Sequence, residues 1–195
     1  MAGRPPATSH LDIERAAFAL FARRGFEDTT VDDIANAAGI GRRTFFRYFA
    51  SKNDVVWGEF DRGLERLRDV LTSADPERPW VTVLREAVVD FNALPTEQVP
   101  LHRERMELIL HVPALQAHAT LMYARWRDVV TEFVAARTGQ KPAELLPRLV
   151  GHAALAAAVA AYEQWLAEPL APLAELLDAA MRHLAYGLGE DRRHG

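Results

Sequence analysis

Hydrophobic positions recur at helical spacing along almost the whole chain. Between successive proline and glycine residues, apolar side chains return every three or four positions, and no segment alternates apolar and polar residues as a strand would. Near the N-terminus, for example, Ile13, Ala17, Leu20 and Phe21 fall on one face of a helix. The pattern predicts an all-α protein.

Three short helices are expected in the first fifty residues. Gly25 can end the first of them, and Thr30 followed by Asp33 is typical of a capping box at the start of the second. The turn Gly39-Ile40-Gly41 separates the second helix from the third, which gives the helix-turn-helix arrangement. The three expected spans are residues 11–24, 31–38 and 42–49.

Longer helices are expected after residue 53. Proline-containing breaks separate them, and residues 73–79 form the clearest break. The sequence therefore predicts a small N-terminal domain, residues 1–53, and a larger domain, residues 54–195, with about nine helices in total. The later helices are expected over residues 54–72, 80–94, 101–111, 113–138, 142–168 and 170–188.

Charge distinguishes the two parts of the chain. The whole chain has 23 Lys and Arg residues against 27 Asp and Glu residues, a formal net charge of -4. Residues 1–53 hold eight basic and six acidic side chains, so they carry +2 and the remainder carries -6. Arg42, Arg43, Arg47 and Lys52 fall within eleven residues that contain no acidic side chain. This local charge favours a nucleic-acid partner, which the net charge alone would argue against.

The third short helix could present this charge to DNA. Phe45 and Phe49 lie four residues apart and can pack on a small core, while Arg43 and Arg47 share another face. Arginine suits bidentate contact with guanine and charge-assisted contact with phosphate. A solvated charged face is the alternative, but the position of these arginines directly after the glycine turn favours DNA.

The stretch from Ala16 to Val55 contains the residues Leu20-Phe21, Gly25-Phe26, Thr29-Thr30-Val31, Ile34-Ala35, Ala38-Gly39-Ile40, Thr44 to Phe49 and Ser51-Lys52. On these residues it resembles the DNA-binding domain of the TetR family of transcriptional regulators. The resemblance implies a three-helix DNA-binding unit, a larger helical ligand-binding domain and a homodimer. It also implies that a small-molecule effector releases the protein from a palindromic double-stranded DNA operator.

Carried over position by position, the resemblance implies contacts between this domain and operator DNA. Thr30 and Lys52 correspond to phosphate contacts, and Thr44 corresponds to a backbone or base contact. Phe46 stands where a tyrosine usually donates a hydrogen bond to a phosphate, and Tyr48 keeps a hydroxyl group nearby. The complete set of predicted DNA-binding residues is Thr30, Arg42, Arg43, Thr44, Phe46, Arg47, Tyr48 and Lys52.

Two further positions depart from the family pattern. Gly41 replaces the serine or threonine that usually caps the recognition helix, at a cost of only a few tenths of a kcal/mol if glycine itself serves as the cap. Arg43 stands where glycine is common. More loosely, residues 41–52 resemble the actinobacterial regulators associated with mycofactocin gene clusters.

The larger domain is expected to dimerise. Alanines between Ala153 and Ala161 allow a close approach of helices, and Leu173 to Leu184 give the next helix an apolar stripe. Each of these residues could equally face the core of its own subunit. A two-fold dimer is nonetheless what so short a recognition helix needs, because two half-sites lengthen the recognised DNA sequence.

The resemblance also places an effector pocket inside the larger helical domain. Family members with apolar pockets often sense fatty acids, acyl-CoA thioesters or aromatic compounds, so the expected effector is acyl-CoA or a similar amphiphile. Any one of the apolar candidates could instead be an ordinary core residue. The tentative pocket residues are Phe91, Met106, Leu110, Met122, Trp126, Tyr162 and Trp165.

Enzymatic activity is not expected. His102, His111 and His118 lack the spacing of a helical zinc site, and none of the three serines lies in a Gly-x-Ser-x-Gly motif. The chain has no cysteine, so it forms no disulfide and no thiolate metal site. Neither a metal nor a cofactor is expected.

The remaining expectations concern location and an alternative function. Residues 1–10 contain no apolar stretch, and the alanine-rich run 153–162 is far shorter than the roughly 20 residues of a membrane-spanning helix. A cytoplasmic protein without a membrane partner is therefore expected. The alternative function is a helical protein-interaction module that does not bind operator DNA.

Overall fold

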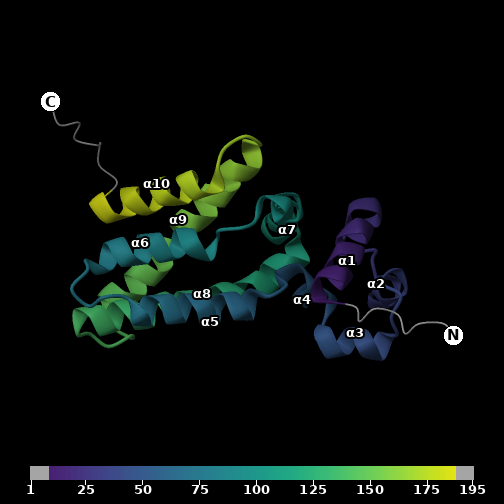
Figure 1. Ribbon diagram of the computed structural model, residues 1–195, viewed down its shortest axis with the longest axis horizontal. Helices are drawn as coiled ribbons and strands as arrows, with labels where there is room; N and C mark the ends of the chain where they lie inside the picture. The colour runs from purple at the N-terminus through teal and green to yellow at the C-terminus, as the bar shows by residue number, and fades with distance from the viewer. Residues whose placement is uncertain (1–8, 188–195) are drawn as a thin grey trace. The chain divides into compact units, whose positions relative to one another are not determined.

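The computed structural model describes residues 9–187, and every regular element in that range is helical (Figure 1). The prediction of an all-α protein is confirmed. The elements are α1 (His10–Arg24), α2 (Val31–Ala37), α3 (Arg42–Tyr48), α4 (Lys52–Trp57), α5 (Phe60–Ser73), α6 (Trp80–Phe91), the 3₁₀ helix η1 (Thr96–Gln98), α7 (Val99–His111), α8 (Pro113–Thr138), α9 (Leu145–Ala167) and α10 (Leu173–Tyr186). Residues 1–8 and 188–195, including the predicted end of the last helix at Leu188, lie outside the described residues.

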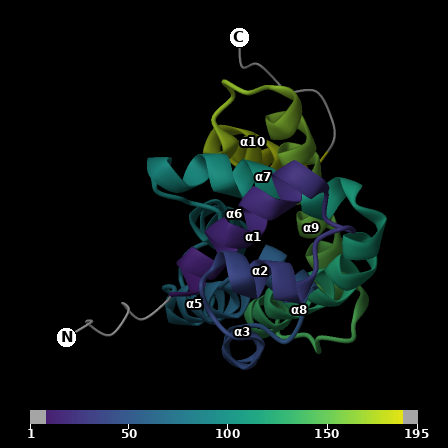
Figure 2. The same cartoon turned by 90° about the vertical axis from the view of Figure 1, so that its right-hand side faces the viewer.

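Local capping explains where the first three helices begin and end. The Thr30 hydroxyl accepts a hydrogen bond from the Asp33 backbone N–H, and the Asp33 carboxylate accepts one from the Thr30 backbone N–H. This is the predicted capping box. Gly25 ends α1 at φ 84, in the region that favours glycine, and Gly41 caps α3 through its backbone only. The three helices lie together in both views (Figure 1, Figure 2).

One predicted helix is wrong. The sequence predicts a continuous helix over residues 54–72, but the structure has two helices, α4 and α5, which are separated at Gly58. Gly58 has φ 54, and a Cβ atom there would overlap with Arg105 Nη1 and lie 2.9 Å from Glu14 Oε1. The break therefore accommodates side chains from α1 and α7, which no local sequence pattern reveals.

Contacts divide the chain into two compact units. Among the described residues, the first contains residues 9–60 together with Thr96–Ala119, and the second contains Asp61–Pro95 and residues 120–187. In the first unit, α1, α4 and α7 contact one another. The two units are defined by contacts within one chain, and such contacts do not test where a DNA-binding domain ends. The predicted domain boundary at residue 53 therefore stays a prediction.

In the second unit α10 packs along α9 and also contacts α6 (Figure 1). Buried residues of α9 include Ala154, Ala158, Ala161 and Trp165. Within the described range, α9 is the one helix whose length and mean hydropathy would suffice to cross a membrane, and a third of that apolar stretch is buried in the protein. A core helix of a soluble protein passes the same test, so this is weak support for a membrane span.

Candidate functional site

The helix α3 has one buried face and one exposed basic face. Phe45 is fully buried and Phe49 is 3% exposed, with their ring centroids 5.8 Å apart. Arg42, Arg43 and Arg47 are exposed on the other side. We call these three residues the arginine surface. Because the aromatic residues fix α3 on the small core, the arginine surface is held outward from a rigid support.

Arg42 is already paired within the protein. Its Nη1 lies 2.9 and 2.8 Å from the two carboxylate oxygens of Asp32 on α2, and its guanidinium lies 5.4 Å from the centroid of the Phe46 ring. Phe46 is 44% exposed beside it. Asp32 was not among the predicted site residues, and its pairing across the intervening turn carries no single-sequence signal.

The other two arginines are less constrained. Within residues 9–187 the Arg43 side chain makes no hydrogen bond or ion pair. The Arg47 guanidinium lies 5.1 Å from the centroid of the Tyr48 ring. Tyr48 and Thr44 are half-buried, and the Tyr48 ring also meets the His10 ring edge-on at 5.0 Å. Arg43 and Arg47 are therefore the side chains of this helix that could reach DNA with the least rearrangement.

The Thr30 hydroxyl is already hydrogen-bonded within the capping box of α2. The hydroxyl donates to the Asp33 carboxylate at 2.6 Å, and Arg24 lies 3.3 Å from the same carboxyl group. The hydrogen bonds from Thr30, foremost the one from its hydroxyl, lower the pKa of Asp33. Asp33 consequently stays ionised at the start of α2, where negative charge is favoured by the helix dipole.

Lys52 is also engaged inside the protein. Its ammonium donates to the carbonyl oxygens of Phe26 at 2.6 Å and Glu27 at 3.3 Å, and it lies 4.2 Å from the centroid of the Phe26 ring. Burial lowers the pKa of Lys52, against the opposing effect of the Glu27 and Asp28 carboxylates. The structure thus places this predicted phosphate contact at the junction of the turn after α1 with the start of α4.

A buried ion pair that the sequence did not predict lies in the same unit. Glu14 on α1 is 5% exposed, and its carboxylate accepts a 2.5 Å hydrogen bond from Arg105 on α7. Arg105 also donates to the Val56 carbonyl oxygen at 2.9 Å, and its guanidinium lies 5.5 Å from the centroid of the Phe18 ring. Three helices distant in sequence therefore meet at one charged group.

Four of the five predicted effector residues in the second unit form two aromatic pairs. The rings of Phe91 and Trp126 are 6.5 Å apart, and those of Tyr162 and Trp165 are 5.9 Å apart. The Tyr162 hydroxyl donates to Asn92 Oδ1 at 2.7 Å. Met122 is half-buried on α8. The two remaining predictions, Met106 and Leu110, lie on α7 in the first unit.

Two polar residues beside these aromatics were missed by the sequence prediction. Asn92 ends α6 and also donates to the Val88 carbonyl oxygen at 2.7 Å. Burial, and secondarily the Glu163 carboxylate, raises the pKa of Tyr123 to about 12. An amide or a tyrosine at helical spacing looks like any other residue of the helix in sequence, so no pattern could single them out.

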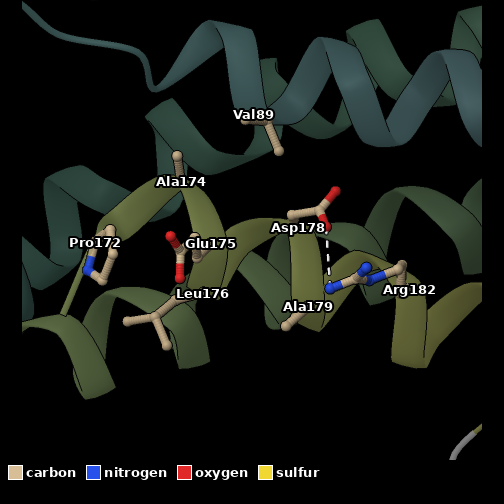
Figure 3. Close-up of a pocket in the computed structure, with 8 residues that line it drawn as sticks. All are labelled: Val89, Pro172, Ala174, Glu175, Leu176, Asp178, Ala179 and Arg182. Atoms are coloured by element: carbon tan, nitrogen blue, oxygen red, sulfur yellow. Dashed lines mark ion pairs between the residues drawn. The ribbon is translucent and has the colours of Figure 1, made fainter.

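An open depression of about 610 Å³ lies between α6 and α10. Figure 3 shows Val89 projecting from α6 over α10, where Asp178 and Arg182 form an ion pair of 3.1 Å. Asp178 also pairs with Arg85 of α6. None of the predicted effector residues lines this depression. Its lining residues are Val89, Pro172, Ala174, Glu175, Leu176, Asp178, Ala179 and Arg182.

The described residues contain no cluster of three or more His, Asp or Glu side chains that could hold a metal ion. Several charged groups are instead paired with an opposite charge within their own unit, such as Arg24 with Asp33 and Arg78 with Glu86. In the second unit, Arg125 lies 2.6 Å from Asp61. Among the described residues, the features that could bind a partner are the arginine surface, the depression between α6 and α10 and the aromatic pairs of the second unit.

Comparison with known proteins identifies the family of both parts of the chain. Residues 13–56 match the family model described as bacterial regulatory proteins of the tetR family. Residues 78–189, more than half of the chain, match the model described as the MftR C-terminal domain. The chain is 43% identical over 186 residues to a Mycobacterium tuberculosis protein named provisionally as the mycofactocin biosynthesis transcriptional regulator MftR, covering 95% of this chain and 94% of that protein.

Solved structures show the same architecture. Thermus thermophilus FadR, a TetR-family transcriptional repressor in complex with lauroyl-CoA, is 25% identical, with a TM-score of 0.59 over 96% of this chain and 100% of that one. The fatty acid degradation regulator FadR from Bacillus halodurans is 19% identical, with a TM-score of 0.67 over 93% of this chain and 100% of that one, which shows the shared fold. Proteins of this kind are regulators that bind operator DNA and small-molecule effectors, and they are not enzymes. The chain belongs to the TetR family of transcriptional regulators and carries a C-terminal domain of the MftR type.

Proposed function

We propose that this chain is a cytoplasmic repressor that binds a palindromic operator as a homodimer and leaves it when an amphiphilic effector binds. Residues 1–53 supply the DNA-binding domain, and residues 54–195 supply the effector-binding and dimerisation domain. The observation that carries the proposal is the arginine surface of α3, because its three arginines are exposed while the neighbouring Phe45 and Phe49 are buried in the small core. Occlusion of a promoter by the dimer is the simplest route from binding to repression.

The proposed DNA contacts are of different chemical types. Arg43 and Arg47 contact base edges or phosphates, and Phe46 makes apolar contact with a thymine methyl group or a sugar. Thr44 and Tyr48 contact the backbone from the edges of the helix. Thr30 and Lys52 act mainly through the parts of the protein they hold in place, since both are hydrogen-bonded to neighbouring groups.

A mobility-shift experiment tests the operator interface. The double substitution Arg43→Ala with Arg47→Ala should weaken binding to the selected operator by about tenfold or more, because each bidentate base contact contributes roughly 1–3 kcal/mol. The operator itself is obtained by selecting bound fragments from genomic DNA. Binding of the parent should fall steeply as salt rises.

The matched control is Arg66→Ala, which removes one exposed cation from α5 in the second unit. It should leave operator binding close to that of the parent. Equal, weak binding by the parent and the double variant would contradict the proposal and favour a protein-interaction module.

The effector proposal rests on a different part of the molecule. The aromatic pairs Phe91 with Trp126 and Tyr162 with Trp165 supply apolar surface, and Asn92 supplies a polar group among them. The FadR of Thermus thermophilus, which shares the architecture, was solved with lauroyl-CoA. We therefore propose an acyl-CoA or a similar amphiphile as the effector.

Thermal-shift and DNA-release titrations test the effector class. Lauroyl-CoA should raise the melting temperature and release the operator, since a ligand that binds only the folded protein stabilises it by mass action. Trp126→Ala should weaken this response. Free coenzyme A is the control for the head group alone. If acyl-CoAs of every chain length produce no response, the acyl-CoA proposal is contradicted. The DNA-binding proposal is unaffected by that result.

A further inference from the structure

We propose that Asp32 is a specificity-determining residue, because it occupies Arg42 in the DNA-free protein and so suppresses binding to DNA of the wrong sequence. The inference rests on the proposed operator interface. It concerns a residue that the sequence did not single out and that makes no base contact of its own.

The geometry joins two helices across the turn between them. Arg42 is the first residue of α3 and Asp32 lies in the first turn of α2. One guanidinium nitrogen of Arg42 lies within hydrogen-bonding distance of both Asp32 carboxylate oxygens, at 2.8 and 2.9 Å. The two side chains remain 62% and 58% exposed. The pair is thus formed in solvent, where an approaching phosphate or base can compete for Arg42.

The three cations of the arginine surface differ in this respect. Within residues 9–187, Arg43 has no ion pair, whereas Arg42 is neutralised by Asp32 and further covered by its contact with Phe46 at 5.4 Å. The other carboxylate of the same turn, on Asp33, is held by Thr30 and Arg24. Asp32 is therefore the carboxylate that sets the charge of the arginine surface.

Competition for Arg42 has different outcomes on different DNA. When Arg42 leaves Asp32 to bind a phosphate, it exchanges one anionic partner for another. The Asp32 carboxylate is then left without its cation, close to other phosphates. A guanine at the correct position accepts two directed hydrogen bonds from Arg42, and the electrostatic potential of the surrounding groove is also negative. Arg42 should consequently add to operator binding while adding little to binding of unrelated sequences.

The substitution Asp32→Asn tests this, because it keeps the shape of the side chain and removes its charge. Affinity is measured by fluorescence anisotropy on the selected operator and on the same duplex with scrambled half-sites, over about 50–200 mM salt. We expect Asp32→Asn to tighten binding to the scrambled duplex about three- to tenfold near 0.1 M salt, the effect of about one additional phosphate contact. Operator affinity should rise less, so the specificity ratio falls.

Two further variants separate this mechanism from a change in overall charge. Glu65→Gln removes one exposed negative charge from α5 in the second unit and should leave the ratio unchanged. In an Arg42→Gln background, Asp32→Asn should lose most of its effect on the scrambled duplex. Equal tightening on both duplexes, an equal effect of Glu65→Gln, or a full effect without Arg42 would each overturn the proposal.

The outcome is distinguishable from failure of the operator interface itself. If the parent shows no salt-sensitive binding and no preference for the selected duplex, the proposed function and this inference both fall. If the parent binds the operator as proposed and Asp32→Asn changes neither affinity, only this inference falls. Thermal unfolding of Asp32→Asn checks that the exposed substitution leaves the fold intact.

Discussion

Lys52 illustrates how the partners of a residue decide what its charge can do. By resemblance its ammonium would contact a phosphate, but two of its three N–H bonds are directed at the carbonyl oxygens of Phe26 and Glu27. An ammonium in this position orders the start of α4 against the turn after α1. Its contribution to DNA affinity is then largely indirect, through the placement of α3 between these segments.

His102 on α7 makes stability depend on pH. Burial, with a smaller effect from the charge of Arg105, lowers the pKa of His102 to about 4 in the folded protein, against 6.5 for an ordinary histidine. Between these values the unfolded chain binds the proton that the folded protein does not, so the free energy of unfolding falls as pH falls from 6.5 to 4. We expect a loss of roughly 2–3 kcal/mol across this window.

Urea unfolding at several pH values measures this effect. His102→Gln should flatten the pH dependence between pH 6.5 and 4, and His111→Gln, at an exposed position of the same helix, is the control. Hydrogen bonds from Ser9 and from Thr30 lower the pKa values of Asp12 and Asp33, and these carboxylates lose their stabilising effect only below 3.8. An unchanged slope in His102→Gln would contradict the assignment.

At the scale of elements, the break between α4 and α5 is coupled to α7. Gly58 has no room for a side chain because Arg105 and Glu14 occupy the space beside it. Arg105 in turn holds the Val56 carbonyl oxygen at the end of α4. The position of α7 and the conformation of the chain after α4 are thus fixed by the same guanidinium group.

Removal of one partner of this ion pair should be costly. Arg105→Met leaves the 5% exposed Glu14 carboxylate without its partner, and loss of one member of a buried pair typically costs about 3–5 kcal/mol. Chemical denaturation should therefore show a large fall in the free energy of unfolding. Operator affinity should fall as well, because Glu14 lies on α1, which packs on α2.

The double variant Glu14→Leu with Arg105→Met is the informative comparison. It removes both charges and replaces them with apolar groups, so it should recover much of the stability lost in Arg105→Met. Arg66→Met, at an exposed position of α5, is a control for loss of a cation. If the double variant is as unstable as the single one, the ion pair is not what stabilises this junction.

At the scale of the whole molecule, operator binding requires a dimer, because a recognition helix of two turns reads only a short half-site. Within one chain, α9 leaves a stripe of small and apolar residues exposed, including Leu149, Ala156 and Ala160. We predict that Ala160→Glu disrupts the dimer, since it places a charge on this stripe. Operator affinity should fall by about tenfold or more when the two half-sites are no longer linked.

Sedimentation and anisotropy on the same samples measure both effects. Ala136→Glu is the control, because it introduces the same charge at an exposed alanine of α8. A dimeric Ala160→Glu variant with normal operator affinity would contradict the prediction and place the dimer contact elsewhere.

The helices that could be predicted are those whose ends are fixed by near neighbours. Thr30 and Asp33 are three residues apart, so the start of α2 was visible in the sequence, and so was the end of α1 at Gly25. The break at Gly58 was not visible, because the side chain that requires it comes from Arg105, far along the chain. The helical class followed from periodicity alone, while the length of one helix did not.

The candidate sites divide in the same way. The basic side and the buried aromatic side of α3 follow from spacing within one short helix, and they were predicted. The pairing of Arg42 with Asp32 and the capture of Lys52 by two carbonyl oxygens involve residues on other elements. Of the seven predicted effector residues, four form two ring contacts in the second unit, and whether they enclose an effector stays a prediction.

The sequence by itself determined the helical class, the helix-turn-helix, the placement of basic charge on α3 and the family resemblance. The first three properties depend on residues close together in the chain, where backbone geometry alone fixes which side chains share a face. The family resemblance depends on the residue pattern from Ala16 to Val55. Only the tertiary structure decided which charges are neutralised, such as Arg42 by Asp32 and Arg105 by Glu14. Such pairs form between residues that packing brings together, and a linear pattern contains no record of that proximity.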